Sequence, residues 1–349
     1  MATTSTKATV LLLSLFVTAG CSKFHRNSAT FDSNGTAYVR RIVPIPSTIS
    51  PESQKWLASL NDRKPGSNVL ADIRAGTDEW RRKDSAEARR LYPVDVTETT
   101  TAGVRTDVIT PLNMPEENRT RVLINLHGGG FISDSGSLIE GIPISNLTRI
   151  RVVSVYYRLA PENPFPAAVD DVVAVYKDLL KTYKPQCIGI FGTSAGAILT
   201  GETAVRLKQL GVPLPGALGI FSGLGDFSRL SDSRSLFTLD GFPGDLALPN
   251  ESHGHSDSYP GSTDRRDPVL SPLFADLHGM PPTLLVTSTR DLLLSDTAMM
   301  HLALLRAGND AQLIVFEALP HAFWYQFHLP ETKEALQLMA RFFEEKVQR

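Results

Sequence analysis

The chain has 349 residues, of which 42% are hydrophobic and 21% are charged, so it can bury a large core in one large α/β domain or two smaller ones. Its formal net charge is -2 and its lysines and arginines are scattered, which argues against a nucleic-acid partner. The two cysteines, Cys21 and Cys187, lie far apart, and this spacing argues against a disulfide framework.

Residues 1–21 have the pattern of an export signal. Lys7 and the amino terminus precede an apolar run of about eleven residues, which is too short to span a bilayer and is followed by small residues. The ending VTAGC resembles a bacterial lipobox, which implies that Cys21 is lipidated and becomes the first residue of the mature protein. We therefore expect a lipoprotein, exported in a bacterium and anchored on the periplasmic or cell-surface side. A plainly cleaved signal and a cytosolic protein with an apolar tail are the alternatives.

Three segments of different pattern follow the signal. Residues 22–50 are rich in Ser, Thr, Asn and Pro without periodicity, which predicts a linker. Residues 51–91 carry sparse apolar positions at helical spacing, which predicts short helices that lie on another surface. Residues 97–111 alternate as strands do, with the pair Ala102-Gly103 as a turn.

The remaining chain alternates between apolar runs typical of strands and segments of helical spacing, so that residues 92–349 are expected to form one domain. Predicted strands are 121–127, 151–159, 186–192, 217–223, 283–288 and 311–319, and predicted helices are 167–183, 195–210, 296–307 and 331–347. Continuous apolar strands joined by helices favour a mostly parallel, doubly wound α/β sheet with helices on both faces. Residues 226–266 interrupt the pattern with turn residues and predict a loop insertion.

The stretch Gly192-Thr193-Ser194-Ala195-Gly196 fits the pattern G-x-S-x-G between a predicted strand and a predicted helix. This context is typical of a nucleophile elbow, in which a serine occupies a strained turn and small neighbours avoid clashes. A plain glycine turn that leads into a helix is the simpler alternative. We expect Ser194 to be a nucleophile at the carboxyl edge of the sheet.

A serine nucleophile needs a base, and in folds with such an elbow the triad follows the chain order Ser, then acid, then His. His321, in LPHAFW, follows the last predicted strand on a loop where catalytic groups collect, and we expect it to be the base. His301 belongs to a patterned helix, which indicates a partly buried helical side chain. His253 and His255 form an H-x-H pair that could bind a metal ion, although such pairs in a polar segment are more often solvated.

The triad acid should follow the strand before the one that precedes the histidine. Asp291 comes three residues after predicted strand 283–288, and we expect it to orient His321. Asp296 lies just before a helical segment, which predicts a helix N-cap instead.

The stretch HGGGF ends a predicted strand with three consecutive glycines, Gly128 to Gly130. Bare backbone at this place lets peptide N–H groups approach a bound molecule closely. Acyl transfer creates an oxyanion that such donors stabilise, so we expect Gly128, Gly129 and the N–H of Ala195 to form an oxyanion hole. Neither G-x-x-x-x-G-K-[ST] nor G-x-G-x-x-G occurs, which argues against a phosphate site.

Five motifs in order, HGGGF, YRLAPENPFPAAVDD, GTSAG, DPVLSPLFADLHGMPPTLLVTSTRDLLLSD and LPHAFW, together resemble the hormone-sensitive-lipase-like branch of the α/β-hydrolase esterases. The resemblance covers roughly residues 95–345. It implies the α/β-hydrolase fold, a helical cap that suits residues 51–91, the triad Ser194, Asp291 and His321, and an oxyanion hole of Gly128, Gly129 and Ala195.

We therefore expect a serine esterase that hydrolyses short-chain carboxylic esters through an acyl-enzyme, with a small-molecule ester as its partner and without a metal ion or organic cofactor. The large side chains of Phe131, Trp324 and Tyr325 should limit the depth of an acyl slot. A lactonase, an amidase or a carbohydrate deacetylase would use the same triad. A ligand-binding receptor on the same scaffold is a further alternative, against which the histidine at 321 argues.

Overall fold

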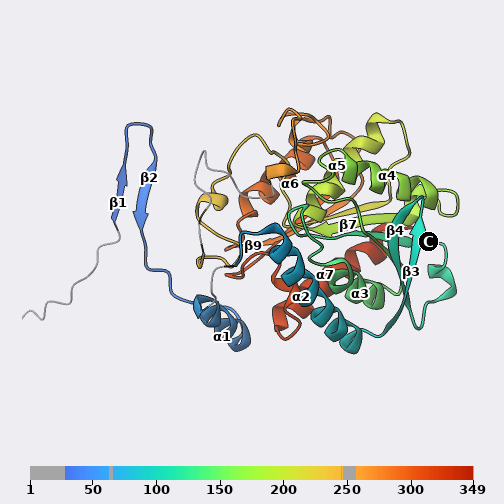
Figure 1. Cartoon of the computed structure of the whole chain (residues 1–349), viewed down its shortest axis with the longest axis horizontal. Helices are drawn as coiled ribbons and strands as arrows, with labels where there is room; N and C mark the ends of the chain where they lie inside the picture. The colour runs from blue at the N-terminus through green and yellow to red at the C-terminus, as the bar shows by residue number, and fades with distance from the viewer. Residues whose placement is uncertain (1–27, 63–65, 245, 247–256, 349) are drawn as a thin grey trace, which may run out of the picture. The chain divides into compact units, whose positions relative to one another are not determined.

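The structure is a computed structural model that describes residues 28–62, 66–244, 246 and 257–348, so Cys21 and the export signal lie outside the described residues. The chain divides into two compact units, Met1–Pro44 and Ile45–Arg349 (Figure 1). In the first unit, β1 (Ser28–Phe31) and β2 (Ala37–Arg40) form an antiparallel hairpin. This hairpin lies in the range predicted as a linker, where strands of only four residues leave little periodicity to detect.

The second unit is built on an eight-stranded sheet with the order β10-β9-β8-β7-β5-β6-β4-β3. Only the pairs β3–β4 and β4–β6 are antiparallel, which confirms the mostly parallel sheet expected from the sequence. The strands are β3 (Val94–Thr101), β4 (Val104–Pro111), β5 (Val122–Leu126), β6 (Arg151–Val155), β7 (Ile188–Thr193), β8 (Ala217–Phe221), β9 (Thr283–Ser288) and β10 (Ala311–Phe316).

Helices cover both faces of this sheet. One apolar core joins the central strands to α4 (Ala167–Leu179), α5 (Ala195–Gln209) and α6 (Leu294–Arg306). The second core, on the other face, joins the strands to α3 (Ser137–Thr148) and α7 (Pro330–Lys346). Both cores consist of buried aliphatic and aromatic side chains, as the packing of helices on both faces of a sheet requires. No described helix is long and apolar enough to cross a membrane.

Helix α3 is absent from the elements predicted above. Gly141 and Pro143 lie inside it, and nearly every residue from Ser137 to Thr148 is buried. A helix that is buried on all sides has no polar face, so its sequence shows no helical period.

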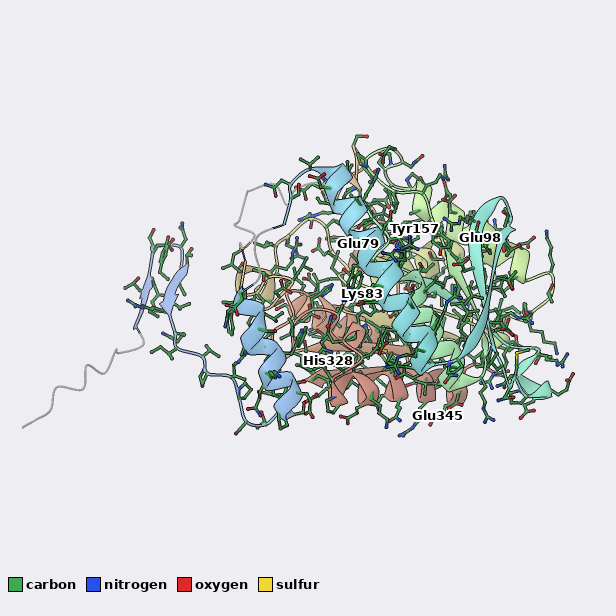
Figure 2. The ribbon with its side chains drawn as sticks, turned by 60° about the horizontal axis from the view of Figure 1, so that its bottom comes forward. Glu79, Lys83, Glu98, Tyr157, His328 and Glu345 are labelled. Carbon is green, nitrogen blue, oxygen red and sulfur yellow. The ribbon has the colours of Figure 1, made fainter. Side chains whose placement is uncertain are left out.

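The predicted cap region consists of α1 (Pro51–Ser59) and α2 (Leu70–Leu91), the latter a single helix of 22 residues instead of several short ones. Ser50 caps α1 by accepting a hydrogen bond from the Ser53 N–H at 3.1 Å. Glu331, at the start of α7, accepts hydrogen bonds from Ser50 N at 2.7 Å and from Ser53 Oγ at 2.7 Å. In α2, exposed residues such as Glu79 and Lys83 alternate with partly buried ones, so the helix lies on the body of the second unit along one face (Figure 2).

Candidate active site

Ser194 occupies a tight turn between β7 and α5. Its backbone has φ 59° and ψ -120°, which is strained for a residue with a side chain. A Cβ atom at Gly192 would lie 2.2 Å from the Leu126 carbonyl oxygen, and one at Gly196 would lie 1.7 Å from it. Only glycine therefore fits two residues before and two residues after the serine, because the turn packs directly on β5. This is the geometry of the predicted nucleophile elbow.

Asp291 and His321 are brought together by two loops at the carboxyl ends of β9 and β10. His321 Nδ1 lies 2.8 Å from Asp291 Oδ1. Asp291 is fully buried, and it also accepts hydrogen bonds from the Leu293 N–H, from Thr287 Oγ1 and from Ser222 Oγ. Burial acts to raise the pKa of Asp291, but His321 and the hydrogen bonds from Ser222 and Leu293 outweigh it and hold the pKa below its ordinary value. Asp291 is thus suited to remain a carboxylate beside the imidazole.

Asp296 is not the predicted helix N-cap. Helix α6 begins at Leu294, so Asp296 lies inside its first turn, and the capping position belongs to Leu293 without a side-chain hydrogen bond. The buried Asp296 carboxyl instead accepts a hydrogen bond from Ser231 Oγ at 2.5 Å. The predicted N-cap was wrong by three residues because helix α6 starts sooner after the strand than the apolar pattern indicates.

The glycine loop lies against the nucleophile elbow, and glycine is needed for a different structural reason at Gly128 than at Gly129 and Gly130. A Cβ atom at Gly128 would lie 3.0 Å from the Thr193 carbonyl oxygen and 3.3 Å from Ser194 Cβ, so this glycine permits close packing. Gly129 and Gly130 have φ 104° and 61°, in the region that favours glycine. The Ile132 N–H donates to the Gly129 carbonyl at 3.1 Å and closes a turn over Gly130 and Phe131.

A cleft of about 1850 Å³ opens over these elements. Ser194, His321 and Ala195 line it, as do Gly129 and Gly130 from the glycine loop. Of the glycines predicted as oxyanion donors, Gly129 lines the cleft, whereas Gly128 is not among the described lining residues. Side chains from the cap region, including Trp56, Ile73 and Trp80, and from residues 227–246 complete its wall.

The large side chains expected beside the acyl slot divide into two groups. Phe131 and Tyr325 line the cleft, as expected. Trp324 is buried behind the elbow, where its indole Nε1 donates to Thr193 Oγ1 at 3.0 Å, and it is not among the described lining residues.

A buried carboxyl behind the elbow was not found by sequence reasoning. Glu140, in α3, is fully buried and accepts hydrogen bonds from Thr193 Oγ1 and from Asn125 Nδ2, the latter at 3.0 Å. Burial raises the pKa of Glu140 to about 7, although both hydrogen bonds act to lower it. Glu140 therefore fixes the side chain of Thr193, the residue next to the nucleophile. A lone glutamate within the apolar run SLIEGIPIS was the only sign of this in the sequence.

Among the described residues, the hydrogen bonds of His301 and His278 lie outside this arrangement, whereas His127 belongs to the glycine loop, where its Nδ1 lies 2.8 Å from the Gly128 carbonyl oxygen. His301 lies on α6 and is partly buried, as predicted, with Nε2 3.4 Å from the Ala311 carbonyl oxygen. His278 pairs with Asp276 on the surface. His253 and His255 lie outside the described residues, and within the described ranges no group of three or more His, Cys, Asp or Glu side chains could hold a metal ion.

Comparison with known proteins agrees with this geometry. A family model described as alpha/beta hydrolase fold matches residues 123–325. An acetyl-hydrolase of Streptomyces hygroscopicus is 31% identical over 235 residues, which are 65% of this chain and 77% of the relative. An esterase of Acinetobacter venetianus is 30% identical over 272 residues, which are 72% of this chain and 84% of the relative.

Solved structures lead to the same family. The crystal structure of an esterase from the bacterial hormone-sensitive lipase family is 28% identical, covers 85% of this chain and 99% of its own, and superposes with a TM-score of 0.73. The matched region contains the elbow, the glycine loop and the loops that carry Asp291 and His321. The chain is thus a carboxylic ester hydrolase and belongs to the hormone-sensitive-lipase-like esterases of the α/β-hydrolase fold.

Proposed function

We propose that this ester hydrolase acts on short-chain carboxylic esters through an acyl-enzyme formed on Ser194. The observation that carries the proposal is the state of His321. Its Nδ1 is fixed by the buried Asp291, its Nε2 has no hydrogen-bond partner among the described residues, and its ring lines the same cleft as Ser194. An imidazole held at one nitrogen and unengaged at the other is suited to take a proton from a serine.

In the proposed reaction, Ser194 Oγ attacks the ester carbonyl while His321 Nε2 takes the hydroxyl proton. Asp291 keeps the Nδ1 proton in place and stabilises the imidazolium that forms. The oxyanion of the tetrahedral intermediate accepts hydrogen bonds from backbone N–H groups, for which we propose Gly129, Gly130 and Ala195, because these residues line the cleft beside the serine. His321 returns the proton to the leaving alcohol, and water then attacks the acyl-enzyme by the same steps.

The preference for short acyl groups rests on two observations. The relative from Streptomyces hygroscopicus is named acetyl-hydrolase, and Phe131 and Tyr325 line the same cleft as Ser194. An acetyl group needs only a small part of about 1850 Å³. We propose that the remaining volume, walled by apolar side chains such as Trp56 and Trp80, holds the alcohol part of the ester.

We also propose that the protein is exported and lipid-anchored through Cys21. The support is the sequence of residues 1–21 alone, with its apolar run and lipobox-like ending.

The triad assignment is tested by Asp291→Asn beside Asp276→Asn. Both aspartates bond a histidine Nδ1, at 2.8 Å and 2.6 Å, but Asp276 lies on the surface. We expect Asp291→Asn to lower kcat by about 10³- to 10⁴-fold with the fold retained, because an amide stabilises the wrong imidazole tautomer. Asp276→Asn should leave kcat unchanged.

Ser194→Ala should abolish turnover, and normal activity in either active-site variant would refute the assignment. Substrates should include p-nitrophenyl esters of graded length, an anilide, a lactone and an acetylated sugar. A strong preference for one of the last three would replace the simple ester as the proposed substrate.

A further inference from the structure

The turn that presents Gly129 and Gly130 is strained. Its two central residues, Gly130 and Phe131, have φ 61° and 65°, and for a phenylalanine this left-handed conformation is unfavourable. Such a conformation persists only where surrounding contacts fix it. The contacts that hold this turn therefore decide where the proposed oxyanion donors point.

Arg74, on the inward face of α2, supplies one of these contacts. Its Nε donates to the Ile132 carbonyl oxygen at 2.8 Å, and Ile132 is the residue that closes the turn on Gly129. One terminal nitrogen donates to the Ala160 carbonyl oxygen at 2.9 Å. The Ala160 N–H in turn donates to the Phe131 carbonyl oxygen at 2.9 Å. Arg74 thus stabilises the turn directly, through Ile132, and indirectly, through Ala160.

Glu162 fixes the orientation of the guanidinium. Its two carboxylate oxygens accept hydrogen bonds from both terminal nitrogens of Arg74 at 2.7 Å, in the fork-to-fork geometry that is specific to arginine. Ala160 and Glu162 belong to the motif YRLAPE, for which the proposed chemistry has no use. Through their contacts with Arg74, these two residues give the motif a role in holding the glycine turn.

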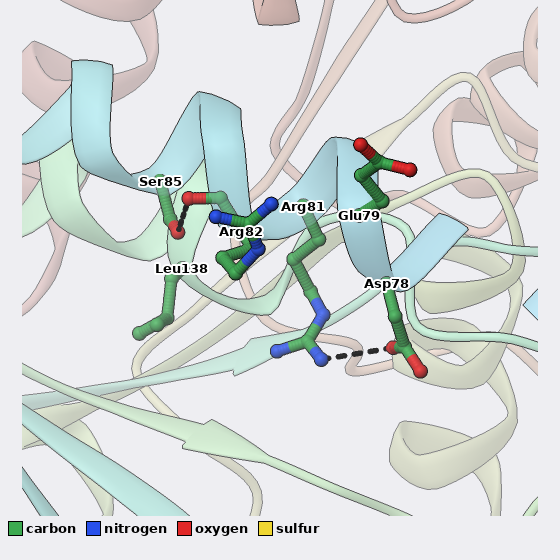
Figure 3. A pocket seen from close by; sticks show the side chains of 6 residues that line it. All are labelled: Asp78, Glu79, Arg81, Arg82, Ser85 and Leu138. Atoms are coloured by element: carbon green, nitrogen blue, oxygen red, sulfur yellow. Dashed lines mark hydrogen bonds and ion pairs between the residues drawn. The ribbon is translucent and has the colours of Figure 1, made fainter. Parts of the chain in front are cut away.

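Arg81 lies on the same face of α2, seven residues after Arg74, and makes a second contact with the body of the unit. It pairs with Asp78 at 2.9 Å (Figure 3), and its Nε lies 3.4 Å from Asp134 Oδ2. Asp134 accepts hydrogen bonds from the N–H groups of Gly136 and Ser137, at 3.1 Å and 3.0 Å. The segment that leads from the glycine turn into α3 is thereby tied to α2 as well.

We propose that α2 is a positioning element for the oxyanion loop and that Arg74 is its positioning residue, with Glu162 as the group that orients Arg74. This inference rests on the proposed function, because it presumes that the glycine turn stabilises an oxyanion. The Arg74 and Glu162 side chains are 30% and 54% exposed, so their pair adds little to the free energy of unfolding. Its effect should appear in the geometry of the turn.

The test compares Arg74→Met and Arg74→Lys with a control on the same helix, Arg90→Met. Arg90 is exposed, and among the described residues its ion pair is with Glu87, at 2.6 Å. Five quantities are measured: kcat and KM for p-nitrophenyl acetate, the inhibition constant of a trifluoromethyl ketone, the active fraction titrated with a fluorophosphonate, and Tm. The trifluoromethyl ketone forms a hemiketal with the serine, and its oxyanion needs the same donors as the reaction.

We expect Arg74→Met to lower kcat about 10- to 100-fold per active site, since a displacement of the donors costs less than the loss of one. The inhibition constant should rise by the same factor, while KM and Tm change little. Arg74→Lys should be impaired as well, because an ammonium cannot reproduce the fork, and Arg90→Met should match the wild type.

Unchanged kcat and inhibition constant in Arg74→Met would overturn the proposal, as would a loss explained by a smaller titratable fraction. If Arg74→Met does not fold, Arg74→Lys and Glu162→Gln carry the same decision with the same readouts. The wild type and Ser194→Ala separate this outcome from failure of the proposed function. If the wild type hydrolyses esters and Ser194→Ala does not, the esterase mechanism stands whatever Arg74 does.

Discussion

Replacement of Asp296 by asparagine should stabilise the fold, by an amount that depends on pH. The side chain is 1% exposed, at the start of α6. Burial raises its pKa from an ordinary value of 3.8 to about 6, while the hydrogen bond from Ser231 and the charge of Arg234 act in the opposite direction. The folded state therefore holds a proton on this carboxyl that the unfolded chain has already lost.

The raised pKa fixes the sign of the effect. Below pH 3.8 the carboxyl is protonated in both states and costs nothing, but between pH 3.8 and about 6 only the unfolded chain releases its proton. The free energy of unfolding thus falls as the pH rises through this window. The loss approaches about 3 kcal/mol above it, since one pKa unit corresponds to about 1.36 kcal/mol. An asparagine has no such equilibrium, and Asp296→Asn removes the loss.

Urea unfolding at several pH values measures this difference. The stability gain of Asp296→Asn over the wild type should be about 2 kcal/mol larger near pH 8 than near pH 4.5 and should level off above about pH 7. Asp276→Asn is the matched control, because contacts with Lys208 and His278 lower the pKa of Asp276 and its replacement should not gain with pH. A gain for Asp296→Asn that is constant or shrinks as pH rises would show that Asp296 is ionised in the fold, and the reasoning would be refuted.

Three further predictions concern substrate length, lipidation and a buried pair. Turnover of p-nitrophenyl esters should be highest for short acyl chains, and a preference for chains beyond about ten carbons would contradict the proposed slot. Labelling with a fatty acid in a bacterial host should tag the wild type but not Cys21→Ser, and an unlabelled, soluble wild type would exclude the lipobox. Tyr259 donates to the fully buried Glu202, whose pKa burial raises well above its ordinary value. Tyr259→Phe should therefore lower the free energy of unfolding by about 1–3 kcal/mol. Glu202→Gln should lower it less, because glutamine mimics the protonated acid. Thermal unfolding measures both variants, and the reverse order would refute this prediction.

The sequence predicts most of the sheet because its strands are continuous apolar runs, and it places Ser194 and Asp291 because both follow such runs directly. Periodicity fails where burial is complete, as in α3. Periodicity also fails to detect the role of Arg74. The sequence pattern of an amphipathic helix is the same whether its arginine faces water or bonds to a turn almost sixty residues further along the chain. Gly128 and Gly129 were equivalent in the sequence, and the backbone angles and cleft lining of the folded chain distinguish them.

The hydrogen bonds between Glu331 and the start of α1 have a consequence for the order of folding. Ser50 and Glu331 are separated by 281 residues, so α1 cannot gain this anchor until residue 331 is available to fold. Contacts of such high sequence separation carry a large loop-closure cost and form late. Helix α1 can therefore have its Ser50 cap, but not its contact with Glu331, while the sheet assembles. The wall that α1 gives to the cleft through Trp56 would be completed after the serine turn already exists.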